Sequence, residues 1–129
     1  MPAAQPAQLA APERRLILAE IREELQRDAQ DLLKRVGPNV PAGLAHLEAN
    51  LEHLVAIVRR SSATHVEPYL SQIHDDICAR CEHQERSAFC PVRHKNECIL
   101  FCGAGPIVAA IRRALREIDI EHEISGLKP

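Results

Sequence analysis

The chain has 129 residues, which is enough for one domain with its own hydrophobic core. Apolar residues make up 46% of it, but there are only one tyrosine, two phenylalanines and no tryptophan. The formal net charge of −2 argues against a general affinity for nucleic acid or anionic membranes, because such binding needs many cations to neutralise phosphates. The abundance of Ala, Leu, Glu, Arg and Gln favours an all-α fold.

The first residues predict a disordered lead-in. Residues 1–11 are rich in Ala, Pro and Gln and contain no continuous apolar run of the kind found in signal peptides. No stretch approaches the roughly 20 apolar residues that a membrane-spanning helix needs. We therefore expect one helical domain over residues 12–129, in the reducing cytoplasm, where cysteines are kept as thiols or bound to metal.

Three amphipathic helices are predicted before the cysteines begin, over residues 12–36, 41–60 and 64–77. In each of them, apolar residues recur at spacings of three and four, as on one face of a helix. In the first helix Ala29 bridges the gap in the apolar stripe, and Gly37-Pro38 is a strong stop. The predicted stripes are Leu18, Ile21, Leu25, Leu32 and Val36; Leu44, Leu47, Leu51, Leu54, Val55 and Val58; and Val66, Tyr69, Leu70, Ile73 and Ile77.

A last helix begins at Gly105-Pro106. Its apolar face is expected to consist of Ile107, Val108, Ile111, Leu115 and Ile118, while Arg112, Arg113, Arg116 and Glu117 face water. Four amphipathic helices joined in this way predict an antiparallel four-helix bundle. In this bundle a cysteine-rich metal-binding loop lies between the third and fourth helices.

All five cysteines lie within residues 78–102. Phe89 and Val92 are the only large apolar residues between positions 78 and 97, so burial alone is a poor way to fold this segment. A bound metal supplies folding free energy where hydrophobic contacts are missing. Five is an odd number, which fits poorly with a closed set of disulfides. The segment is therefore predicted to bind a metal through thiolates, which are soft ligands that select zinc, Cu(I) or iron–sulfur clusters.

Two cofactors compete for these thiolates. A [4Fe–4S] cluster accepts wide and irregular spacings, and a CxxC followed by a cysteine next to proline is similar to a local feature of ferredoxin cluster segments. This interpretation takes Cys78, Cys81, Cys90 and Cys98, with Cys102 as the alternative fourth ligand if it is not a core thiol. Tetrahedral zinc would instead use a C-x2-C-x16-C-x3-C arrangement that omits Cys90. We favour the cluster because it uses Cys90.

Backbone groups beside the last two cysteines would favour a negatively charged cluster. The peptide N–H groups near Gly103 and Gly105 are expected to be available to sulfur, and the positive end of the last helix points toward Cys102.

Histidines near this segment are secondary candidates. His74 precedes Cys78 by one helical turn, and His83 and His94 lie among the cysteines, where each could replace one thiolate on zinc. His46 and His53 are interpreted as helix-surface residues.

No other catalytic constellation is evident, so the chain is not expected to be a stand-alone enzyme, although a reactive thiolate at Cys78 or Cys81 is a further possibility. The hypothesis is a small cytoplasmic iron–sulfur protein that acts in electron transfer, in redox sensing or as an accessory subunit of a larger complex. A zinc-stapled helical module for protein interaction is the alternative. Either version implies a protein partner, allows a homo-oligomer, and predicts no nucleic acid or membrane partner.

Overall fold

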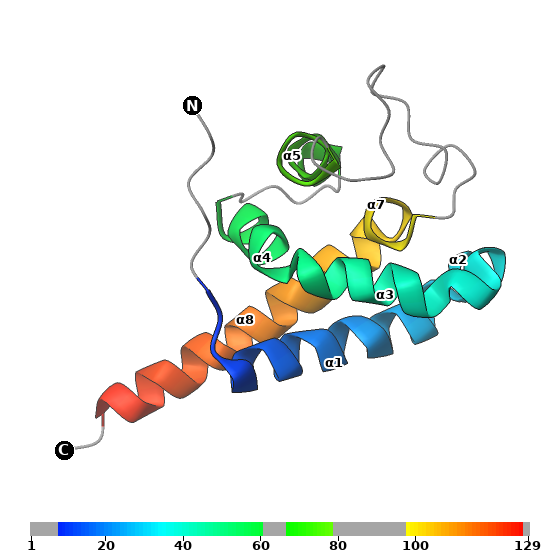
Figure 1. Ribbon diagram of the computed structural model, residues 1–129. Helices are drawn as coiled ribbons and strands as arrows, with labels where there is room; N and C mark the ends of the chain where they lie inside the picture. Colours follow the sequence, from blue (N-terminus) through cyan, green and yellow to red (C-terminus); the bar gives the residue numbers. More distant parts are fainter. Residues whose placement is uncertain (1–7, 61–66, 79–97, 128–129) are drawn as a thin grey trace.

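The computed structural model describes residues 8–60, 67–78 and 98–127, and all the regular structure within these ranges is helical (Figure 1). The composition predicted this class, and the prediction is confirmed. Most of the lead-in predicted over residues 1–11 lies outside the described ranges. The first helix begins at Ala11, where the Glu13 carboxylate accepts a hydrogen bond from the Ala10 N–H at 3.3 Å.

The first predicted helix is two helices in the structure. α1 spans Ala11–Asp28 and α2 spans Gln30–Val36, and Ala29 between them has φ −134° and ψ 33°, outside the helical region. The prediction of one continuous helix over residues 12–36 was therefore wrong at Ala29. Neither proline nor glycine stands at this point. The turn instead lies between two packing surfaces: α1 packs along α8 (Ala104–Leu127), whereas α2 packs against α7 (Ile99–Cys102).

The second predicted helix is divided as well. A short 3-10 helix, η1 (Gly37–Asn39), leads into α3 (Val40–Ala49), and α4 (Leu51–Arg60) follows after Asn50. The side-chain Nδ2 of Asn50 donates a hydrogen bond to the carbonyl oxygen of His46 at 2.9 Å, and the Asn50 backbone N–H donates to the same oxygen at 3.2 Å. A side chain that bonds the backbone in this way competes with regular helix geometry. The asparagine thus explains the break that the apolar pattern did not show.

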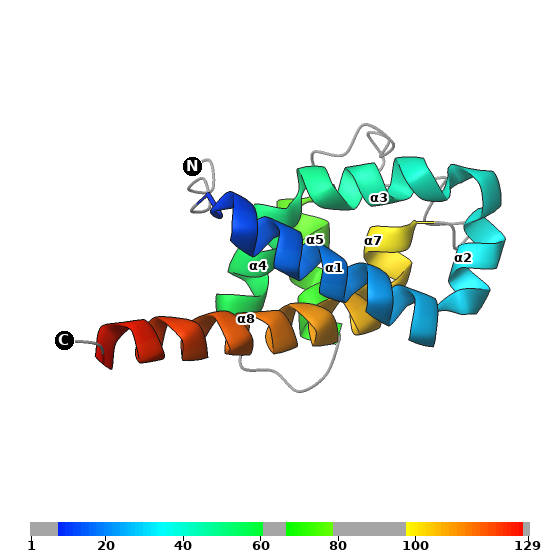
Figure 2. The same ribbon diagram turned by 90° about the horizontal axis from the view of Figure 1, so that it is seen from below.

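The remaining helices are α5 (Glu67–Asp76), α7 (Ile99–Cys102) and α8 (Ala104–Leu127). α5 and α8 correspond to the third and fourth predicted helices. α7 is a single turn directly before α8 that was not predicted. The C-terminal part of α8 extends past the other helices, as Figures 1 and 2 show.

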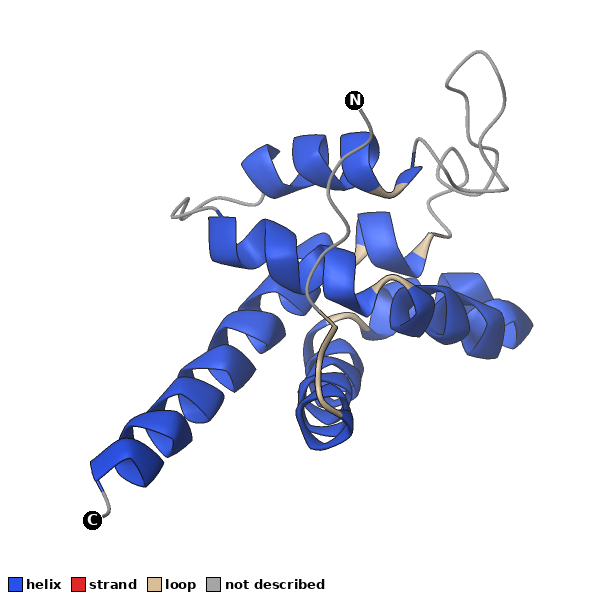
Figure 3. Cartoon of the chain, turned by 60° about the vertical axis from the view of Figure 1, so that its left-hand side comes forward, coloured by secondary structure: helices blue, strands red, loops and turns tan. Residues whose placement is uncertain are grey.

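One hydrophobic core lies where the helices meet. α1 and α8 share the most extensive interface, and α4 packs against both α8 and α5. α5 therefore forms an outer layer on the side of α4 that faces away from α1 (Figures 1 and 3). The fully buried large residues of α1 are Ile17, Ile21 and Leu25. Leu18, which was predicted for this stripe, is only half-buried.

Two arginines that were predicted to face water are instead half-buried between helices. The Nε of Arg113 donates a hydrogen bond to Oε2 of Glu20 at 2.9 Å, and its Nη2 lies 3.2 Å from Oε2 of Glu24, so it joins α8 to α1. Arg112 donates a hydrogen bond to the Tyr69 hydroxyl, and its guanidinium carbon lies 5.2 Å from the centre of the Tyr69 ring. Helical periodicity identified the polar face of α8 but not the neighbours that cover part of it.

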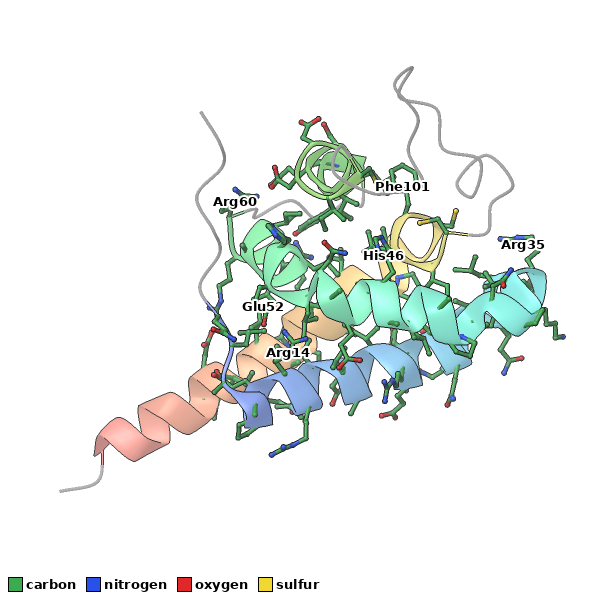
Figure 4. The ribbon with its side chains drawn as sticks, viewed as in Figure 1. Arg14, Arg35, His46, Glu52, Arg60 and Phe101 are labelled. Atoms are coloured by element: carbon green, nitrogen blue, oxygen red, sulfur yellow. The ribbon has the colours of Figure 1, made fainter. Side chains whose placement is uncertain are left out.

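A third arginine joins α1 to the middle of the chain. Arg14 and Glu52 point toward each other and form an ion pair (Figure 4), and Arg14 also donates a hydrogen bond to the carbonyl oxygen of Glu48 at 2.8 Å. Partial burial raises the pKa of the Glu52 carboxyl, but the hydrogen bond from Arg14 and the charge of its guanidinium help to bring this pKa below its ordinary value. Glu52 is therefore held as a carboxylate at neutral pH.

Candidate metal centre

Cys78 is positioned by the end of α5. The apolar side chains of Ile73 and Ile77 are 1% and 2% exposed, and the Ile77 N–H donates a hydrogen bond to the Ile73 carbonyl oxygen at 2.9 Å. Cys78 follows directly, is 8% exposed and belongs to the hydrophobic core. A thiol at the edge of a core can serve as a small apolar side chain or, when deprotonated, as a ligand to a soft metal.

Cys98 and Cys102 are positioned by α7. Cys98 is the N-cap residue of this helix, with φ −84° and ψ 108°, and the Cys102 N–H donates a hydrogen bond to the Cys98 carbonyl oxygen at 2.8 Å. The two cysteines are therefore one helical turn apart. Between them, Ile99 and Leu100 are each 1% exposed and anchor α7 in the core.

Burial does not separate Cys98 from Cys102 as a candidate ligand. The sequence favoured Cys98 on the expectation that Cys102 is a core thiol. Both residues are half-buried and pack against the edge of the core. Half-burial is therefore compatible with a ligand role for either cysteine.

Only some of the predicted ligands lie within the residues that the structure describes. Cys81 and Cys90 lie outside the described ranges, as do His83 and His94, and for His74 only the backbone of α5 is described. Within the described part of the chain, no three His, Cys, Asp or Glu side chains form a group that could hold a metal ion. Cys78, Cys98 and Cys102 form no disulfide there. What the structure provides is the helical support for the two ends of the cysteine segment (Figure 3).

The backbone next to Cys102 differs from the sequence-based expectation. The N–H of Gly103 was expected to be available to a cluster sulfur, but it donates a hydrogen bond to the carbonyl oxygen of Ile99 at 2.8 Å. That expectation was wrong for Gly103, because this residue is the C-cap of α7 and its N–H is used within that helical turn. α8 begins at the next residue, so the N-terminus of a long helix does follow Cys102 closely. This helix end carries a partial positive charge that favours a nearby thiolate.

The two histidines of the second predicted helix were expected on helix surfaces. His46 lies in α3 and His53 in α4, and both are half-buried rather than on the open surface that was expected. The Nδ1 atom of His46 lies 3.4 Å from the side-chain Nδ2 of Asn50. His46 therefore belongs to the polar contacts at the α3–α4 break.

A shallow, open pocket lies at the α1–α2 junction. It is lined by Gln26, Gln30, Leu33 and Lys34. None of these side chains is a ligand for a soft metal, so the pocket adds nothing to the cysteine centre.

Comparisons with known proteins found no matching family model, no matching curated protein and no matching solved structure. Among the described helices, none is both long enough and apolar enough to cross a membrane.

Proposed function

We propose that this protein holds one [4Fe–4S] cluster on Cys78, Cys81, Cys90 and Cys98 and acts in electron transfer, in redox sensing or as an accessory subunit of a larger complex. The observation that carries the proposal is the concentration of all five cysteines in residues 78–102. Cys78 and Cys98, near the two ends of this segment, are each supported by a helix whose apolar residues are in the core.

Thiolates fit an iron–sulfur cluster by their chemistry, because they are the ligands that such clusters use. A bound cluster would supply one-electron redox chemistry, while the chain would set its exposure and its hydrogen bonds. Cys102 remains the alternative fourth ligand, and His74, His83 and His94 remain minor alternatives.

The second candidate is a zinc-stapled helical module for protein interaction. One observation favours it: Cys98 and Cys102 are one helical turn apart and both half-buried, so they can act as a ligand pair with Cys78 and Cys81. In this version the metal is structural, and function resides in the protein that the helices bind.

The same proposal includes the architecture and the setting. In this proposal α1 and α2 together form one interrupted helix of an antiparallel four-helix bundle, and α3 and α4 form a second. The cysteine segment is a metal-binding loop between α5 and α8. The protein works in the cytoplasm with a protein partner, as a monomer or a homo-oligomer, and without nucleic acid or membrane.

The test is to purify the protein without oxygen, record its visible absorption spectrum and measure iron, zinc and sulfide per chain. A brown protein with about four irons and four sulfides per chain supports the cluster. A colourless protein with about one zinc per chain refutes the redox proposal and supports the zinc module. Protein that takes up neither metal, also after anaerobic reconstitution, overturns both.

Single Cys→Ser variants then identify the ligands. Loss of metal in the Cys78, Cys81 and Cys90 variants is expected for the cluster, whereas a zinc site leaves the Cys90 variant fully loaded. Cys98→Ser and Cys102→Ser form a matched pair on one helical turn, and only the variant that removes a ligand should lower the metal content.

A further inference from the structure

α8 carries apolar residues on two different sides. Its core-facing side includes Ile111, Leu115 and Ile118, which are at most 7% exposed. Among the described residues, Ile120 is the only large apolar side chain that is exposed, at 48%. A helix turns by about 100° per residue, so Ile120 lies about 200° around α8 from Ile118. It is therefore on the side of the helix opposite the core.

Two further apolar residues continue this side by their sequence positions. Ile124 and Leu127 follow Ile120 by four and seven residues within α8, so the helical period assigns all three to one face. We call these three residues the outer stripe. They belong to the C-terminal part of α8, which extends past the other helices (Figures 1 and 2). The outer stripe is thus separate from the apolar face that builds the core of this chain.

Charged residues of opposite sign stand on either side of Ile120 along the same face. Arg116 precedes Ile120 by four residues and is exposed, and Glu123 follows it by three. A second copy of α8 that runs antiparallel reverses this order, so Arg116 of each copy comes opposite Glu123 of the other. A parallel copy in register would instead place like charges side by side. The pattern is complementary to its own reverse, which favours a second copy of this chain over a partner of another kind.

We propose that the outer stripe is a homodimer interface in which two copies of α8 pack antiparallel and cross near Ile120. The cores of the two chains then lie on the outer sides of the helix pair, because the stripe is opposite the core-facing side. One pair of helices buries less surface than a standard interface, so we expect a weak dimer with a dissociation constant on the order of 10 µM. This inference goes beyond the proposed function and does not depend on a bound metal.

The first test is sedimentation equilibrium of the full chain, with a reductant present so that disulfides between cysteines do not contribute. The average mass should rise from one chain to two between about 1 and 300 µM, a range that brackets the expected constant. At the lowest concentration the protein is mainly monomeric, so unfolding measured there reports single chains. Protein that stays monomeric throughout the range refutes a second copy as the occupant of the stripe.

Ile120→Asp tests whether the outer stripe is the surface that dimerises. It places a charge in the stripe and should weaken dimerisation about tenfold or more. Because Ile120 is exposed in the single chain, this variant should keep the helical circular dichroism of the unchanged protein. A dimer that Ile120→Asp leaves intact uses another surface and overturns the proposal.

A charge exchange tests the antiparallel direction. Arg116→Glu should weaken dimerisation about tenfold, because it brings two glutamates opposite each other. Arg22→Glu makes the same change of charge at an exposed residue of α1 and should leave the dissociation constant unchanged. Arg116→Glu combined with Glu123→Arg restores opposite charges and should restore dimerisation. A double variant that dimerises no better than Arg116→Glu contradicts the antiparallel arrangement.

Discussion

The contact between Arg113 and the two glutamates of α1 gives the sharpest test of the fold, because it joins the two helices with the most extensive interface. Replacing Arg113 with methionine keeps a long side chain but removes the guanidinium. The hydrogen bonds to Glu20 and Glu24 are then lost, while Arg27 continues to donate a hydrogen bond to Glu24. Neither α1 nor the apolar face of α8 is otherwise altered.

The expected cost of Arg113→Met follows from the solvent exposure of Arg113 and of the two glutamates that it contacts. The side chain of Arg113 is 38% exposed, whereas that of Glu20 is 19% and that of Glu24 is 10% exposed. Two charge-assisted hydrogen bonds with one partly exposed member are screened by solvent, so we expect a loss of about 1–2 kcal/mol in the free energy of unfolding. Because Arg27 remains on Glu24, the cost stays below the roughly 3–5 kcal/mol of an unpaired buried charge.

The pH dependence has a definite sign. The hydrogen bond from Arg27 holds the pKa of the Glu24 carboxyl below its ordinary value; burial opposes this, and the hydrogen bond from Arg113 adds to it. A carboxyl whose pKa is lower in the folded state stabilises the fold above its unfolded pKa of about 4.3, and this stability is lost as the pH falls through the folded pKa. The difference between Arg113→Met and the unchanged protein should therefore be full above about pH 5 and should shrink in acid.

The assay is urea unfolding of equally metal-loaded samples at several pH values, with Arg116→Met as the matched control. Arg116 lies on the same helix but is exposed, so its replacement should cost no more than about 0.5 kcal/mol. If Arg113→Met is as stable as this control at pH 7, or if its deficit grows toward low pH, the assigned contact with α1 is incorrect.

Two further predictions compare matched positions by the same unfolding assay. Gly103→Ala should lower the free energy of unfolding by about 1–3 kcal/mol, because the new Cβ would lie 2.6 Å from the carbonyl oxygen of Ile99. Gly105→Ala should be nearly neutral, because nothing lies within 4 Å of its Cβ. Equal costs would contradict the close packing around α7. Ile21→Ala should lower the free energy of unfolding by about 2–5 kcal/mol, because Ile21 is fully buried. Ile120→Ala should cost less than about 1 kcal/mol, because Ile120 is 48% exposed. The reverse order would mean that α1 and α8 pack on other faces.

Some features of the candidate metal site could be predicted from the sequence, and others only from the structure. The cysteine segment and its spacing were evident from the sequence, because a soft-metal site is recognised by residue type. Its helical support was not, since α7 is too short to leave a periodic apolar pattern. Nothing in a single sequence showed that Cys102 is half-buried or that the Gly103 amide is already bonded to Ile99.

For the fold as a whole, the sequence determined the helical class and some of the positions where helices stop. Periodicity at three and four residues is a local property, and Gly37, with φ 58°, ends α2 where the sequence predicted. Long-range contacts decided the rest. The turn at Ala29, the choice of Ile17 over Leu18 and the burial of Arg112 and Arg113 all depend on which helices lie opposite. A helix presents several possible faces, and only the neighbours that pack against it determine which one is buried.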